Sequence, residues 1–174
     1  MAGVTDADDP QRFAYLAAGN ARQARKRVAA DVLITDQAGR VLLVDPTYKP
    51  GWDMPGGMAE ANEPSRAAAE RGLREELGLE LNVGRLLLLE WQPPHGPWDD
   101  LLMFVFDGGT LDGEAAGALQ IRDDELRAFT FVSIDDARPL LRPYVWERLQ
   151  RAVRAKPHGR TVYEERPALP PQST

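Results

Sequence analysis

The chain of 174 residues contains no cysteine. It therefore has no disulfide framework, no thiol nucleophile and no zinc–thiolate site. No early apolar run resembles a signal peptide, and no apolar segment approaches the roughly 20 residues that a membrane-spanning helix needs. We expect a cytoplasmic protein that does not associate with a membrane.

A basic surface is also lacking. The chain has 21 Lys and Arg against 27 Asp and Glu, a net charge of −6, and no stripe of basic residues to neutralise a phosphate backbone. This excludes a general binder of nucleic-acid polymers, whereas the acidity suits a site that recruits metal. With 43% hydrophobic residues, the chain can bury one core, and one catalytic domain is the natural count.

The segment from Asn62 to Leu77 predicts a helix. Apolar residues recur every four positions at Ala69, Leu73 and Leu77 and make a buried stripe. Asn62 or Ser65 is expected to cap its start, and Gly78 suits the left-handed residue that ends a helix.

Glu75 and Glu76 lie off this stripe and repel each other. Taken alone, such a pair is best explained as a solvated acidic face with Arg71 and Arg74 as helical partners. The surrounding residues favour a different explanation.

The stretch from Gly57 to Leu79 resembles the signature of the Nudix hydrolase family, G-x5-E-x7-R-E-U-x-E-E-x-G-U, where U is aliphatic. The matching positions are Gly57, Glu63, Arg71, Leu73, Glu75, Glu76, Gly78 and Leu79. The preceding segment from Trp52 to Gly57 also resembles the W-x-x-P-G-G sequence common in this family.

The resemblance implies hydrolysis of a diphosphate linked to another moiety, with Mg²⁺ or Mn²⁺ as cofactor. It implies that Glu75, Glu76 and the backbone carbonyl of Gly57 hold the metal. Carboxylate and carbonyl oxygens are the ligands that Mg²⁺ prefers. The resemblance also makes Glu63 and Arg71 a supporting ion pair.

Gly72 departs from the signature, because the family has glutamate there as a metal ligand or as the base that activates water. On the helix, Gly72 lies angularly between Glu75 and Glu76, and no neighbouring side chain replaces the missing carboxylate. Any general base must therefore come from another segment.

The acidic segment before the strand predicted at Phe129 to Ile134 is one source of that base. In many Nudix enzymes the equivalent loop supplies a further glutamate to the metal site, and Glu125 stands at the matching distance. We therefore assign catalytic and metal-binding roles to Glu125 together with Glu75 and Glu76. Asp123 and Asp124 are alternatives, as is a merely solvated loop.

Three residues on predicted loops are candidates for substrate binding. Tyr48 and Trp98 offer aromatic faces for the part of the substrate beyond the phosphates, and Lys49 can neutralise phosphate oxygens. The expected partner is a small-molecule diphosphate.

The order of strands and helices, together with the resemblance, predicts an α+β fold, an α/β/α sandwich with a mixed sheet between helices. We divide the chain into an N-terminal flanking helix (residues 1–27), a Nudix domain (28–155) and a tail containing proline (156–174). The helix, predicted from Pro10 to Arg27, is expected to pack on the domain or on a second subunit of a homodimer. The tail is expected to be disordered or an arm.

Two other functions are alternatives to hydrolysis. Loss of the glutamate at Gly72 favours a non-hydrolytic domain that binds a phosphorylated ligand or a protein partner. Isopentenyl diphosphate isomerases also resemble Nudix proteins, but those enzymes have an active-site cysteine, and this chain has none.

Overall fold

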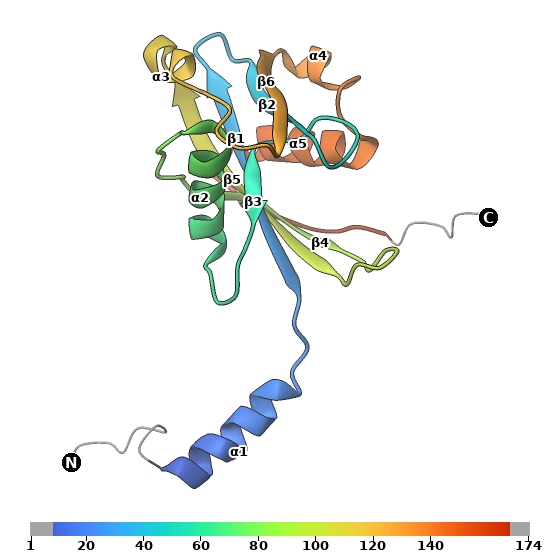
Figure 1. Ribbon diagram of the computed structural model, residues 1–174. Coiled ribbons are helices and arrows are strands. Elements are labelled where there is room, and N and C mark those ends of the chain that lie inside the picture. Colours follow the sequence, from blue (N-terminus) through green and yellow to red (C-terminus); the bar gives the residue numbers. More distant parts are fainter. Residues whose placement is uncertain (1–8, 168–174) are drawn as a thin grey trace.

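The computed structural model describes residues 9–167. Within them a seven-stranded mixed sheet lies between helix α2 (Ser65–Leu77) on one face and helix α5 (Pro143–Ala155) on the other (Figure 1). The predicted α+β architecture is confirmed. The strands are β1 (Arg27–Asp36), β2 (Val41–Pro46), β3 (Gly56–Met58), β4 (Leu86–Gln92), β5 (Leu101–Leu111), β6 (Leu126–Val132) and β7 (Val162–Glu165).

The sheet has the strand order β6-β2-β1-β5-β4-β7, and β3 pairs with β1 outside this path. The β1–β5 and β4–β7 pairs are parallel and the remaining pairs are antiparallel. Because β1 is central, its residues from Ala29 to Ile34 are buried on both faces of the sheet, which explains the nearly continuous apolar run in this strand.

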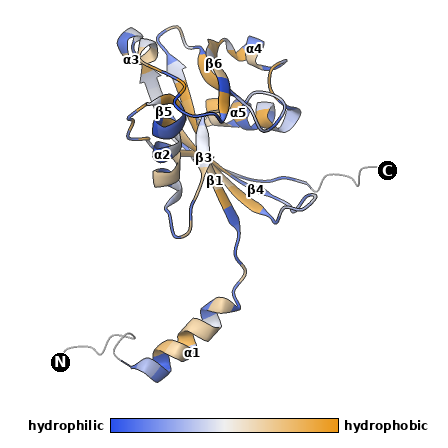
Figure 2. Cartoon of the chain, in the orientation of Figure 1, coloured by the Kyte–Doolittle hydropathy of each residue, from blue (hydrophilic) through white to orange (hydrophobic). Residues whose placement is uncertain are grey.

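Two apolar clusters hold the helices against the sheet. One joins α2 to β1 through residues such as Val32, Ile34, Leu73 and Leu77. The other joins α5 to the opposite face through residues such as Leu33, Leu87, Val145 and Leu149. Figure 2 shows apolar residues concentrated along the strands. Burial of each such side chain stabilises the fold by about 1.5–3 kcal/mol.

Helix α2 ends as predicted, with Gly78 in the left-handed conformation at φ 65°. Its predicted start was wrong. The helix begins at Ser65 after Pro64, with no side-chain cap. Asn62 itself occupies a left-handed turn at φ 62°, a conformation that asparagine tolerates better than most residues, and so it lies outside the helix.

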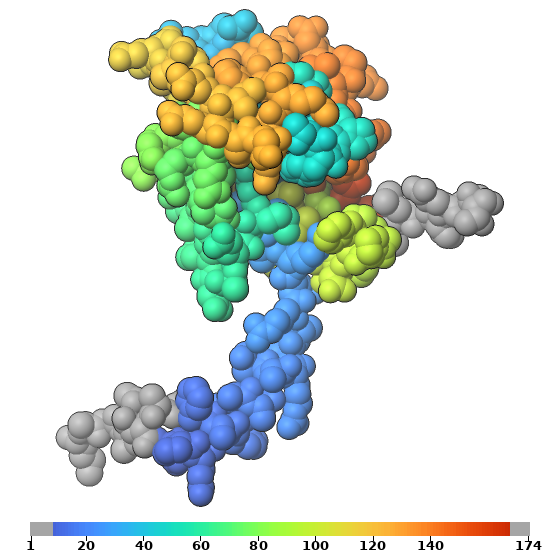
Figure 3. All heavy atoms as spheres, viewed as in Figure 1, coloured from blue at the N-terminus to red at the C-terminus, as the bar shows by residue number. Residues whose placement is uncertain are grey.

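Helix α1 (Pro10–Ala21) is shorter than predicted and has no buried residue. Figure 3 shows it apart from the body of the protein, joined by a narrow connection. The expected packing on the domain is therefore absent from the described chain. Contact with a second subunit stays a prediction.

The tail differs from the prediction over residues 162–165, which form the edge strand β7 instead of an arm or a disordered segment. Leu88 of β4 pairs with Val162, and Trp91 pairs with Glu165. Backbone hydrogen bonds to β4 order this short, polar segment, and its composition gives no sign of them. Residues 168–174 of the predicted tail, and residues 1–8 of the predicted flanking segment, lie outside the described residues.

Two short helices complete the fold, α3 (Gly113–Gly117) and α4 (Ile134–Ala137). In the described part of the chain, no helix combines the length and apolar character required to cross a bilayer.

Candidate active site

A gap between β1 and β2 creates the site. These neighbouring strands share one pair of Cα partners, Thr35 and Val41, and separate beyond it. The loop that follows β2 enters the gap, where Asp53 bridges to Val44 and β3 pairs with Ala29 to Asp31 of β1. The segment Gly56-Gly57 is thereby held between β1 and α2.

Glycines allow these backbones to pack directly. A Cβ on Gly56 would lie 2.1 Å from the carbonyl oxygen of Ala30, and a Cβ on Gly72 would lie 2.4 Å from the carbonyl oxygen of Gly56. Both distances are below any allowed contact, so glycine is required at each position. Gly72, which departs from the signature, thus packs directly on β3.

Arg71 connects the two ends of the signature segment, Gly57 to Leu79. Its guanidinium donates to both carboxylate oxygens of Glu63 at 2.9 Å, to the carbonyl of Met58 at 2.8 Å and to Glu75 at 2.8 Å. Arg71, with further help from the backbone amide of Glu60, lowers the pKa of Glu63 to about 2. This ion pair holds the loop after β3 against α2.

An acidic cleft of about 680 Å³ opens beside α2. Its carboxylates come from three segments: the loop after β3, helix α2 and the loop before β6. They belong to Glu60, Glu75, Glu76, Asp123, Asp124 and Glu125. Gly57, Gly72 and Tyr48 also line the cleft.

Glu76 is the most perturbed of these acids. Its Oε2 atom is buried and has no hydrogen-bond partner among the described residues. Burial, together with the charges of Asp123, Asp31 and Glu125, raises the pKa of Glu76 to about 8, although a hydrogen bond with the Gly56 backbone opposes the shift. A buried carboxylate oxygen without a partner, among other carboxylates, is a strong candidate to bind a cation.

The loop that carries Glu125 is fixed over the cleft by Thr47. The Thr47 amide donates to the carbonyl of Glu125 at 2.7 Å, and its hydroxyl donates to the carbonyl of Asp124 at 3.0 Å. Asp123 accepts from the Glu125 amide at 3.1 Å. The structure thus brings Glu125 into the same cleft as Glu75 and Glu76, with Asp123 and Asp124 beside it.

These residues fit a magnesium or manganese ion. The unpaired Oε2 of Glu76 is a hard oxygen donor, and Glu75 and the backbone of Gly57 line the same cleft. In residues 9–167 no three acidic or histidine side chains already converge as a complete ligand set. Mg²⁺ is usually held by one or two carboxylates plus water and substrate phosphates, so such a set is not required.

A smaller pocket of about 100 Å³ adjoins the cleft, and both are lined by Tyr48, Gly56 and Glu76. Lys49 lies in this inner pocket and bonds Asp53 at 2.7 Å. Burial opposes the charge of Lys49, but Asp53 outweighs burial and raises the pKa of the ammonium group.

Asp31 also lines the inner pocket and was missed from the sequence. Burial, with the charge of Asp53, raises the pKa of Asp31 to about 7, although the buried Arg148 of α5 donates to it at 3.0 Å. One signal could have indicated Asp31: it is the single charged residue within the apolar run from Val28 to Ile34.

The three predicted substrate contacts are placed differently from one another. Tyr48 is 65% exposed and lines both pockets, and Lys49 lines the inner one. Trp98 lies on the loop between β4 and β5, where Arg27 stacks on its ring at 5.0 Å, and it lines neither pocket.

Comparison with known proteins places this site in a family. A family model described as NUDIX domain matches residues 25–155. No match was found among curated protein sequences.

Similar solved structures include the MutT protein of Methanosarcina mazei Go1, with 20% identity and a TM-score of 0.64 over 77% of this chain and 99% of that one. A UDP-X diphosphatase has 20% identity and a TM-score of 0.69 over 90% and 75% of the two chains. An ADP-ribose pyrophosphatase from Streptococcus suis has 17% identity and a TM-score of 0.58 over 82% and 100%. Since the family match covers most of the sequence and includes the whole signature from Gly57 to Leu79, this chain belongs to the Nudix hydrolase family.

Proposed function

We propose that the protein is a hydrolase that depends on Mg²⁺ or Mn²⁺ and cleaves a diphosphate bond in a nucleoside diphosphate derivative or a related small molecule. The observation that carries the proposal is Glu76. Its buried, unpaired carboxylate oxygen lines a cleft with Glu75 and Glu125. A carboxylate cluster of this kind suits a divalent cation and the phosphates that the cation neutralises.

The substrate class is supported by the similar proteins. One is named for UDP-X and another for ADP-ribose, and both names denote a nucleoside diphosphate joined to a further group. At 17–20% identity these likenesses support the fold, so the identity of the nucleoside and of the attached group is left to experiment.

In the proposed mechanism, Glu75, Glu76 and the carbonyl of Gly57 would hold the metal ion, which would offset the charge of the diphosphate. Glu125 accepts a proton from the attacking water. The water oxygen forms a bond to one phosphorus, and the bond from that phosphorus to the bridging oxygen breaks. The bridging oxygen leaves with the electron pair on the departing phosphate group.

Lys49 and Tyr48 are proposed to position the substrate. Lys49 stays positively charged in the inner pocket, because Asp53 favours its protonated form and raises its pKa. Tyr48 exposes its ring at the boundary of the two pockets. Trp98 stays a prediction for the distal part of the substrate.

A hydrolysis screen tests the proposal. Nucleoside triphosphates, nucleotide sugars, ADP-ribose, dinucleoside polyphosphates and non-nucleotide diphosphates are incubated with Mg²⁺ or Mn²⁺, and products are resolved by mass. Performing the reaction in ¹⁸O-labelled water identifies the phosphorus that is attacked. Turnover that requires metal and disappears in Glu76→Gln supports the proposal. Tight binding of a substrate without turnover would instead favour a non-hydrolytic binding domain.

A further inference from the structure

A second concave surface lies away from the active site, between the end of α5 and β7. We name it the α5–β7 groove. It has a volume of about 560 Å³ and is lined by Arg151, Arg154, Ala155, His158, Arg160 and Val162. None of these residues lines the acidic cleft or the inner pocket. Helix α5 packs on the sheet face opposite α2.

The groove is basic in a chain whose net charge is −6. Four of its six lining residues are arginine or histidine. Arg151 is shared among three acids, with distances of 3.6 Å to Glu90, 3.7 Å to Glu164 and 4.0 Å to Glu147. The side chains of Arg154, His158 and Arg160 have no ion pair or hydrogen bond within residues 9–167.

Helix capping does not account for these cations. A basic residue near a helix C-terminus usually neutralises the last carbonyls. Here Arg85, which precedes β4, does so, since its guanidinium donates to the carbonyls of Ala155, Lys156 and Arg160. The side chains of Arg154 and Arg160 therefore keep their donors available.

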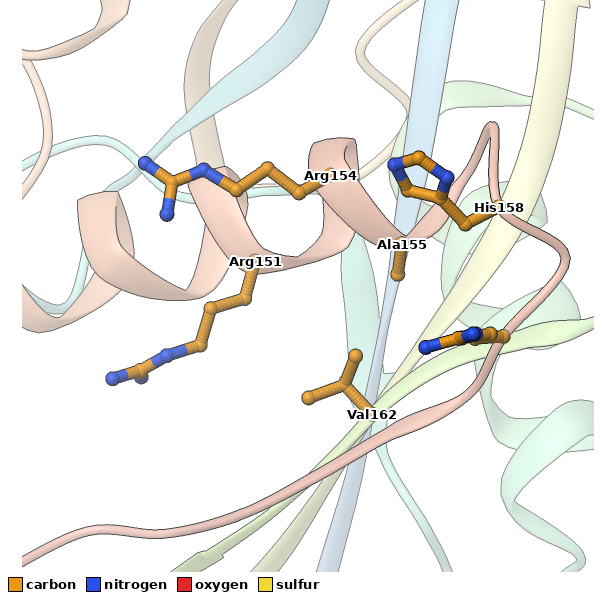
Figure 4. Close-up of a pocket in the computed structure, with 6 residues that line it drawn as sticks. Arg151, Arg154, Ala155, His158 and Val162 are labelled. Atoms are coloured by element: carbon orange, nitrogen blue, oxygen red, sulfur yellow. The ribbon is translucent and has the colours of Figure 1, made fainter.

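The shape of the groove also favours a ligand with an apolar part. Figure 4 shows Arg151 and Arg154 extending from α5, His158 on the segment that follows, and Val162 facing Ala155. Ala155 is buried, so the groove has an apolar floor beneath its basic rim. Its volume is within the usual range for small-molecule sites, about 300–1,000 Å³.

We propose that the α5–β7 groove binds a small organic phosphate. Arg160 binds the phosphate, because a guanidinium matches phosphate oxygens with two parallel donors, and Arg154 and His158 add positive charge along the same groove. Ala155 and Val162 contact the organic part. This site does not depend on the proposed hydrolytic activity.

The two histidines of the chain provide the test. His158 lines the groove, whereas His95 lies on the loop between β4 and β5, so one ring reports on the groove and the other serves as an internal reference. AMP is the probe, because it has no diphosphate bond to cleave. Its binding is followed through the ring-proton resonances of both histidines by NMR, with EDTA present to remove metal from the active site.

The expected result is a saturable shift of the His158 resonances while those of His95 stay unchanged. Arg154→Ala/Arg160→Ala should weaken AMP binding by about 10-fold or more, since one lost charged hydrogen bond is worth about a tenfold factor or more and two positive charges leave the groove. Inorganic phosphate should bind more weakly than AMP, because it lacks the part that contacts the apolar floor.

The matched control is Arg25→Ala/Arg138→Ala, which removes the same charge from two exposed positions outside the groove and should leave AMP binding unchanged. Thermal unfolding of both double variants checks that they fold. The proposal is overturned if AMP leaves His158 unmoved, if both histidines shift alike, or if the two double variants bind equally. It is also overturned if inorganic phosphate binds as tightly as AMP, or if an RNA oligomer shifts His158 and AMP does not.

Discussion

The backbone of Gly72 in α2 lies against the carbonyl of Gly56 in β3, so that a Cβ atom on Gly72 would be 2.4 Å from that oxygen. The same Cβ would also lie 3.0 Å from the amide nitrogen of Gly57. All of these neighbours are backbone atoms, which cannot rotate away. The departure from the family signature is therefore coupled to the position of the strand that supplies a predicted metal-binding carbonyl.

Gly72→Ala should destabilise the protein by about 1–3 kcal/mol, the usual cost of adding atoms to a packed core. Helix propensity alone predicts the opposite, a gain of about 1 kcal/mol. We expect packing to outweigh propensity because β3 would have to move away from α2. The free energy of unfolding in urea measures the difference.

Gly117→Ala is the matched control, since Gly117 lies at the end of the short helix α3 with open space around it, and its effect should be small. Gly72→Glu should lose stability and should not gain hydrolytic activity. A stable Gly72→Glu variant with turnover raised about 10²-fold or more, the value of a positioned base, would contradict this account.

Glu76→Gln should stabilise the metal-free protein at pH 8 and abolish the stabilisation that Mg²⁺ or Mn²⁺ provides. Burial raises the pKa of Glu76 from 4.5 to about 8, so the folded state retains a proton that the unfolded state has lost. Metal-free stability is then highest below pH 4.5 and falls as pH rises to about 8, by at most about 1.4 kcal/mol per pH unit for one group. Thermal unfolding with and without metal, from pH 5 to 8, measures both effects.

Glu75→Gln is the comparison, because Glu75 is exposed and bonded to Arg71 and should show no gain at pH 8. The stability of metal-free Glu76→Gln should still decline somewhat as the pH rises, since Asp31 also has a raised pKa of about 7. Equal metal affinity of wild type and the Glu75→Gln/Glu76→Gln double variant, measured by calorimetry, would remove these residues from the metal site.

The spacing of apolar residues and the residues that end helices predicted the two helices that cover the sheet. The spacing of Val145, Leu149 and Val153 predicts a last helix from Pro143 to Ala155, which α5 matches, and Gly78 ends α2 as expected. Short elements were less predictable. β3 and β7 have three and four residues, and pairing with distant strands determines them more than their own composition does.

The site was predictable where it follows a local spacing and unpredictable where it depends on packing. The signature placed Glu75 and Glu76 side by side on α2 and paired Glu63 with Arg71 without knowledge of the fold. The inner pocket joins Asp31 of β1 to Lys49 and Asp53 of a later loop, and only the separation of β1 from β2 brings these residues together. The contact between Gly72 and Gly56 depends on the same separation.

Glu63→Gln should lower stability at neutral pH, and its difference from wild type should shrink as the pH falls from about 4.5 to about 2. Arg71 lowers the pKa of Glu63 to about 2. A lowered pKa gives stability above the unfolded value that is lost on protonation. Urea unfolding at pH 7, 4.5 and 3 follows the change. Glu80→Gln serves as the control, because Glu80 is 77% exposed and 4.0 Å from Arg74, and such pairs contribute little. If the free energy of unfolding of Glu63→Gln differs from that of wild type by the same amount at every pH, the packing of Glu63 matters and its charge does not.

Glu125→Gln should lower kcat by about 10²- to 10⁴-fold, the range for a general base, while changing stability little. Its backbone carbonyl, not its side chain, accepts the hydrogen bond from the Thr47 amide that fixes the loop. Asp124→Asn tests the neighbouring carboxylate, which lines the same cleft and has the same charge. Steady-state kinetics on the substrate found by the screen should show the large loss in Glu125→Gln alone. If Asp124→Asn shows the large loss instead, the base is Asp124; if both variants retain kcat, the loop does not supply the base.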